Sequence, residues 1–231
     1  MKFRQFRAVL VKDLRLFFVS EGVIYVSMVL SIGLVAVFRF GHGIADMGLE
    51  TANSILWAAQ LISGIFLMMA SYEWEHANKS HYLCRILGVE AYIQFLGKAS
   101  ALAVALVILW LCNLLFFFVL LSGFFLAPDT GVQRFIKLFF DLLLAGTFVI
   151  PGLALMGTLT SSIAGQGRLK HALLFILFFP LALPVLISGS TATRVLLQFN
   201  GLELQVLYIA LAFDLVYLGA GILLYALLIE E

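Results

Sequence analysis

Residues 99–125 read ASALAVALVILWLCNLLFFFVLLSGFF, a run without a single charged side chain. An α-helix needs about 20 mainly apolar residues to cross the hydrocarbon core of a bilayer, so this run is long enough to cross and to tilt. A strand of a membrane barrel would be shorter and would alternate apolar with polar residues. The run therefore predicts a transmembrane helix.

The rest of the chain repeats this pattern. Of its 231 residues, 63% are hydrophobic and 12% charged, and the mean hydropathy is +1.10, whereas soluble domains are about half apolar and a quarter charged. Backbone polar groups must be satisfied inside lipid, which favours a helical bundle. We expect an all-α polytopic membrane protein, a single transmembrane domain over residues 1–231. Its six predicted spans are residues 22–38, 54–71, 99–125, 138–159, 172–188 and 206–229.

Lysine and arginine are divided unevenly between the two sides that six spans create. Ten of the 14 fall in the N-terminal segment and in the loops after the second and fourth spans. Cytoplasmic loops carry the excess of these residues, so both termini are predicted to be cytoplasmic. The four on the other side are Arg39, Arg134, Lys137 and Arg194.

The first 18 residues form a separate element. Phe3, Phe6, Leu10, Leu14 and Phe17 recur at steps of three and four, which places them on one face of a helix, with basic residues around the other side. This pattern predicts an amphipathic helix lying in the membrane interface. The alternative is a positively charged flank that only sets the topology.

The loop between the second and third spans, residues 72–98, mixes both signs of charge with aromatic residues. It is long for a connection within a bundle, and part of it is predicted to be a short helix along the membrane. Such a helix could dock in a groove of a peripheral partner protein, with Glu73, Glu75 and Arg85 as the candidate contact residues. A solvated loop without a partner is the alternative.

The sequence lacks recognisable motifs for catalysis, nucleotide binding or metal binding. The sequence has no GxxxxGK[ST] phosphate loop, no HExxH, and no Cys/His cluster with metal-ligand spacing. Cys84 and Cys112 form no recognisable pair. We therefore predict no catalytic residue, no metal ligand and no covalently bound cofactor, and the scattered basic residues predict no nucleic-acid partner.

Two carboxylates fall inside predicted spans, Asp141 in the fourth and Asp214 in the sixth. A charge in the hydrocarbon core is costly, so such residues are candidates for function. Asp141 has Lys137 four residues earlier as a partner; Asp214 has no local partner. Each is either a polar contact between helices or a participant in a transport cycle. Pro151, Pro180 and Pro184 should kink the fourth and fifth spans.

Several short motifs, taken in order, resemble the CcmB family, the membrane permease of the haem-export ABC transporter for cytochrome c maturation. The resemblance covers most of the chain. It rests on the following stretches: Lys12-Asp13, Leu56-Trp57, Glu73 and Glu75 at the exit of the second span, Gly97-Lys98, Gly157-Thr158-Leu159, Arg168, and Pro180 to Pro184. One departure is the missing proline near Gly88-Val89.

The resemblance implies a permease in a bacterial cell inner membrane whose ABC ATPase is a separate chain docking on residues 72–98. It implies haem as a transported ligand, or release of a haem-loaded chaperone. Other implied partners are a haem-handling membrane protein, a small membrane protein and the periplasmic haem chaperone of the same maturation system. Six spans are half of a typical exporter's twelve, which favours a homodimer or a pairing with another membrane subunit.

Two other functions remain open from the sequence. The chain could be a six-span ABC export permease for a lipid or a drug, or a membrane scaffold for assembly without transport. Co-purification with an ATPase would separate the permeases from the scaffold, and cytochrome c maturation in a deletion strain would separate haem from other substrates.

Overall fold

The computed structural model of the chain describes residues 2–20, 22–41, 48–77, 84, 86–120, 132–164, 170–199 and 204–230. Within these ranges all elements are helical. The seven α-helices are α1 (Lys2–Arg15), α2 (Val23–Gly41), α3 (Leu49–Ala77), α5 (Ala91–Leu120), α7 (Val132–Ala164), α8 (Lys170–Phe199) and α9 (Leu204–Glu230). A π-helical turn, Leu16–Ser20, follows α1.

Six of these helices are long and apolar enough to cross a membrane. This confirms the prediction of an all-α protein with six candidate spans. The segments that qualify are Val23–Gly41, Glu50–Glu73, Ala91–Val119, Ile136–Ile163, Ala172–Leu197 and Leu207–Leu228.

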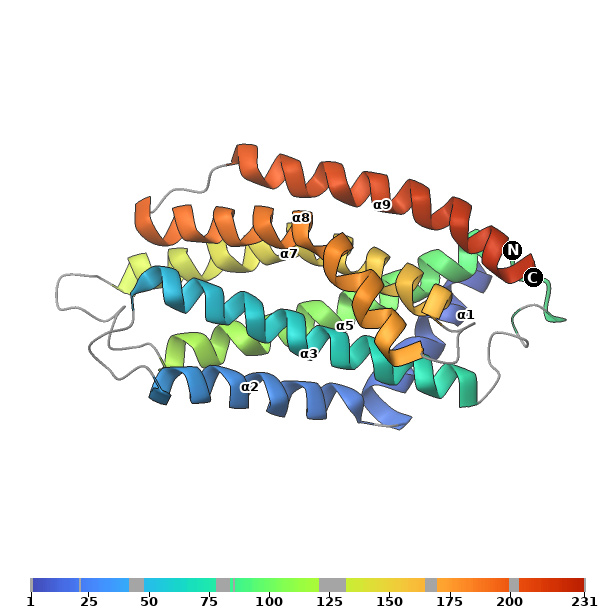
Figure 1. Cartoon of the computed structure of the whole chain (residues 1–231), viewed down its shortest axis with the longest axis horizontal. Helices are drawn as coiled ribbons and strands as arrows, with labels where there is room; N and C mark the ends of the chain where they lie inside the picture. Colours follow the sequence, from blue (N-terminus) through green and yellow to red (C-terminus); the bar gives the residue numbers. More distant parts are fainter. Residues whose placement is uncertain are drawn as a thin grey trace.

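The six long helices run side by side as one elongated bundle (Figure 1). Both chain termini lie at the same end of it, together with α1 and the start of α5. We call this the termini end, and the opposite end the far end.

Several helices extend past the predicted spans, and the fifth and third spans differ most from their predicted limits. The fifth was expected to stop at residue 188, but α8 continues to Phe199 through a stretch of serine and threonine. These side chains bond back to carbonyls in their own helix: Ser188 Oγ donates to the Val185 carbonyl at 2.8 Å, and Ser190 Oγ to the Ile187 carbonyl at 3.2 Å. Polar residues satisfied in this way fit inside a membrane helix. The third span begins at Ala91, before the predicted residue 99, and residues 121–125 lie outside the described part.

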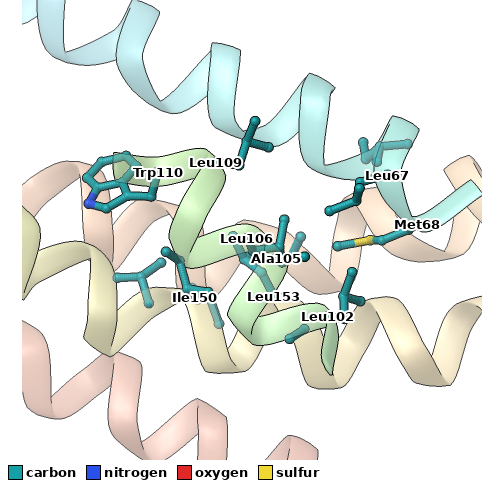
Figure 2. Close-up of a cluster of buried hydrophobic side chains, with 14 of the residues drawn as sticks. Leu67, Met68, Leu102, Ala105, Leu106, Leu109, Trp110, Ile150 and Leu153 are labelled. Carbon is teal, nitrogen blue, oxygen red and sulfur yellow. The ribbon is translucent and has the colours of Figure 1, made fainter. Parts of the chain in front are cut away.

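Helices α3 and α5 occupy the centre of the bundle. Of the residues in the α3 span, 56% are buried, against 22% in α9, which is the most peripheral span. Figure 2 shows leucine, methionine and tryptophan side chains of α3 and α5 meeting Ile150 and Leu153 of α7. Close contacts at glycine help: a β-carbon at Gly157 of α7 would lie 2.5 Å from the Met68 sulfur. The apolar residues left exposed face outward, as lipid contact requires.

The prolines predicted to kink the spans all lie within helices, Pro151 in α7 and Pro180 and Pro184 in α8. Proline removes a backbone donor and its ring crowds the preceding turn. Figure 1 shows α8 changing direction part-way along its length.

Candidate functional site

The predicted docking residues lie around the loop that joins α3 to α5. Glu73 is exposed near the end of α3. The backbone at Glu75 also belongs to α3, although its side chain lies outside the described residues, as does all of Arg85. The structure therefore places Glu73 at the surface of the termini end and leaves the other two untested.

The end of this loop has a defined geometry. The Val89 N–H donates to the Cys84 carbonyl at 3.1 Å, and Gly88 adopts a positive φ of 65°. This is the Schellman arrangement that closes a helix, in which glycine supplies the left-handed residue. Cys84 is buried beneath the turn, while Ile86 and Leu87 are 80% and 73% exposed. Two apolar side chains are thus held outward by a fixed turn.

The start of α5 is tied both to this turn and to α1. Gln94 Nε2 donates to the Val89 carbonyl at 2.8 Å. Lys2 Nζ lies 3.2 Å from a Glu90 carboxylate oxygen and 5.5 Å from the centre of the Tyr92 ring. The contact with Tyr92, followed by the hydrogen bond and charge of Glu90, raises the pKa of Lys2 above its ordinary value. The ammonium group therefore stays charged across the neutral range.

Helix α1 crosses α5 at a glycine. A β-carbon at Gly97 would lie 2.8 Å from Val9 Cγ1, so only glycine permits this approach. Val9 is buried, as are Leu16 and Phe17 in the following turn. The N-terminal helix thus packs against the bundle at the termini end.

Of the two intramembrane carboxylates, Asp214 on α9 faces α7. A β-carbon at Gly152 would overlap its Oδ1, so the carboxylate lies directly against the α7 backbone beside Pro151. This oxygen is buried, and among the described residues it has no side-chain hydrogen-bond partner; its contact is with the backbone of Gly152. A buried carboxylate oxygen without a side-chain partner is unusual enough to need an explanation.

Asp141 on α7 is half-buried, and Lys137 is exposed. The part of the chain that the structure describes contains ion pairs of Lys2 with Glu90 and of Lys12 with Asp13, but the expected pairing of Lys137 with Asp141 is not formed there. The structure does not bring Asp141 and Asp214 together in a shared contact.

Uncharged polar residues link the helices by hydrogen bonds, and no pattern in the sequence predicted these contacts. At the far end, Thr193 Oγ1 of α8 donates to Asn53 Oδ1 of α3 at 2.6 Å. Trp57 Nε1 donates to Thr193 at 2.9 Å, and Asn53 Nδ2 donates to the Ser190 carbonyl at 2.8 Å. These bonds join α3 to α8.

A second chain of bonds joins α2, α3 and α5. Asn113 Nδ2 donates to Gln60 Oε1 at 2.8 Å, and Gln60 Nε2 donates to the Leu106 carbonyl at 3.2 Å. Ser31 Oγ donates to Asn113 Oδ1. All three side chains are buried. Their signal in the sequence is the amide group inside an apolar run, which a search limited to charges overlooks.

Two tryptophans pack between these bonded groups. The rings of Trp57 and Trp110 are tilted, with centroids 4.8 Å apart. Each is backed by a glycine: a β-carbon at Gly189 of α8 would lie 2.7 Å from Trp57, and one at Gly146 of α7 would overlap Trp110 Nε1. Trp110 Nε1 donates to the Leu142 carbonyl at 3.3 Å. We call Asn53, Trp57, Gln60, Trp110, Asn113 and Thr193 the polar clasp.

Within the described residues, no three His, Cys, Asp or Glu side chains lie close enough to hold a metal ion. The described parts of the chain thus offer interhelical contacts, a capped loop with outward apolar residues, and a half-buried carboxylate, Asp214, with its Oδ1 atom buried. Such an arrangement can bind a partner and change shape.

Comparison with known proteins identifies the family. The sequence model of the CcmB protein family matches residues 4–227, and no curated protein matches the chain. Because the match spans nearly the whole chain, the protein belongs to the CcmB family. CcmB is the multi-pass permease of the haem-export ABC transporter in cytochrome c maturation, and the ATPase of that transporter lies on a partner protein, CcmA.

Proposed function

Because the chain belongs to the CcmB family, we propose that it converts ATP hydrolysis by its partner ATPase into a movement of the bundle, through the loop at residues 72–98. The movement drives haem export or the release of the haem-loaded periplasmic chaperone. Family membership favours this function over a lipid or drug permease and over a scaffold without transport.

One observation carries the proposal. Ile86 and Leu87 are exposed at the termini end and held by the turn at Gly88, directly before α5. Apolar side chains presented by a fixed backbone are what a groove on a partner buries, because little ordering is needed on binding. Exposed Glu73 lies at the end of α3, where the same loop begins.

The proposal includes the orientation and surroundings of the chain. We place the chain in a bacterial inner membrane with its termini end on the cytoplasmic side, where the ATPase can contact the loop directly. Helix α1 then lies in the interface: Arg4, Arg7 and Arg15 are exposed toward anionic headgroups, while Val9 packs on the bundle. The haem-handling membrane protein, the small membrane protein, the periplasmic haem chaperone and a second copy of the chain complete the complex.

We also assign Asp214 to the transport cycle. A structural contact between helices would give its carboxylate a side-chain partner, whereas Oδ1 lies against the Gly152 backbone and has no side-chain partner among the described residues. A partner gained in another state of the cycle would account for it. For Asp141 we propose a polar contact with no part in the cycle.

The test replaces Ile86 and Leu87 by serine in cells that lack the native chain. We expect the ATPase to co-purify about tenfold less, the loss that results when one good interface anchor is removed, and cytochromes c to remain without haem. Tyr208→Ser is the matched control, because Tyr208 is 65% exposed near the start of α9, and α9 begins at the far end (Figure 1). Undiminished ATPase binding to the double variant would show that the loop is not the docking site.

A further inference from the structure

The first two turns of α5 pack against other helices on two sides. On one side α1 reaches them through Val9 at Gly97 and Lys2 at Glu90. On the other side α9, distant in sequence, packs on Phe95 and Lys98. The short segment that follows the Gly88 turn therefore contacts both terminal helices of the bundle.

The contact between α5 and α9 is tightly packed. The Phe95 ring is fully buried, and a β-carbon at Gly221 of α9 would overlap its Cζ. One turn further along, the Tyr225 ring lies 5.5 Å from Phe95, with the Lys98 ammonium 5.6 Å from its centre. A ring wedged against bare backbone cannot move without moving that backbone, since protein interiors are close-packed.

The face of α9 that packs on Phe95 also contacts the two proline-containing helices, α7 and α8. Gly221, Tyr217 and Asp214 are spaced by four and three residues, so they share one side of the helix. Tyr217 donates from its hydroxyl to the Leu181 carbonyl of α8 at 2.6 Å, between the two prolines of that helix. Asp214 lies against Gly152, next to Pro151 of α7. One side of α9 thus touches α5, α8 and α7 in turn.

We propose that Phe95 and Gly221 form a joint that carries movement of the docking loop from α5 to α9, and through α9 to the proline-containing parts of α7 and α8. Both are positioning residues: they act through α9 and not on a transported molecule. The joint rests on the proposed function, because it needs an ATPase that moves the loop.

The test uses the full chain co-expressed with its partner ATPase. In Gly221→Ala the new methyl group pushes Phe95 and changes the angle between α5 and α9. We expect ATPase binding and turnover to stay near the parent level while haem attachment to cytochrome c falls about tenfold, a typical size for lost coupling between two sites. A purely structural role would lower all three together, and that result would overturn the proposal.

The chain supplies a matched control two residues away. A β-carbon at Gly219 would meet nothing within 4 Å, so Gly219→Ala should behave as the parent. Phe95→Leu shortens the ring side chain and makes room for the new methyl group, so the double variant Phe95→Leu with Gly221→Ala should regain most of the maturation. Equal maturation in the two alanine variants, or no rescue, would contradict the joint.

If Gly221→Ala does not accumulate in the membrane, Phe95→Leu alone replaces it. This variant loosens the contact without a clash, and the same separation of ATPase turnover from maturation is expected; full maturation would overturn the joint. Failure of the docking proposal looks different, because it would leave the ATPase bound to the Ile86 and Leu87 serine variant.

Discussion

The polar clasp and the contact between α7 and α9 solve the same problem in opposite ways. Both place polar groups inside an apolar bundle. In the clasp, each amide group of Asn53, Gln60 and Asn113 is matched to a partner on another helix. Across α7 and α9, the Asp214 carboxylate instead lies against the Gly152 backbone, with no side-chain partner for Oδ1 among the described residues.

This difference indicates which helices can move relative to each other. Satisfied polar groups in a water-free interior fix one arrangement, because any shift leaves them without partners. The Asp214 carboxylate, whose contact across this interface is with the Gly152 backbone, loses no side-chain hydrogen bond when the helices shift. We infer that the stretches of α2, α3, α5 and α8 joined by the clasp are the static part of the bundle, and that the contact of α7 with α9 around Gly152 and Asp214 is where the bundle rearranges.

The largest effect on stability is expected from overpacking the polar clasp. In Gly146→Ala the added methyl group overlaps Trp110 and displaces it from the Leu142 carbonyl. We expect the free energy of unfolding in detergent micelles to fall by about 1–3 kcal/mol, the usual cost of overpacking. Gly33→Ala is the control, because its β-carbon would meet nothing within 4 Å. Equal stability of the two variants would mean that the clasp is not tightly packed.

A smaller effect is expected from removing one bonded amide group. Asn113→Leu leaves Gln60 Oε1 and the Ser31 hydroxyl without the partner they have now. The expected loss is about 0.6–1.7 kcal/mol, the range for interhelical hydrogen bonds in membranes. In a double-mutant cycle with Gln60→Leu, the combined loss should be less than the sum of the two. Strict additivity would show that the two amide groups do not act together.

The smallest effect on stability is expected at Asp214. A substitution there tests most directly whether the contact between α7 and α9 serves movement and not stability. Asp214→Asn keeps the shape of the side chain and removes no side-chain hydrogen bond from Oδ1, so the free energy of unfolding should change by less than about 0.6 kcal/mol. Maturation of cytochromes c should nevertheless drop, measured by haem staining at matched membrane levels. Asp141→Asn serves as the control. Normal maturation in Asp214→Asn would remove the carboxylate from the transport cycle.

The sequence was sufficient for the spans because lipid leaves few choices. An uncharged run such as residues 99–125 has to be helical and has to cross, and α5 does form there. The limits of α8 were wrong because hydropathy counts serine and threonine as polar, whereas here the serine hydroxyls bond to carbonyls in their own helix.

The candidate site was predictable only in part. The charge of Asp214 marks it within an apolar run, and the glycine before α5 marks the loop end. No local pattern pairs Asn53 with Thr193 or Phe95 with Gly221, because those contacts depend on how distant helices meet. The partner ATPase was predicted from the family resemblance and not from any motif in this sequence.

The packing of Phe95 on Gly221 also has a consequence for biosynthesis. A ribosome delivers α5 to the membrane well before α9, so Phe95 enters the bilayer with one side uncovered and stays so until the last helix is inserted. During that interval the segment next to the docking loop lacks one of its two supports. A chain whose synthesis stops before α9 would therefore present the ATPase with a poorly supported loop, and recruitment of the partner would favour finished copies.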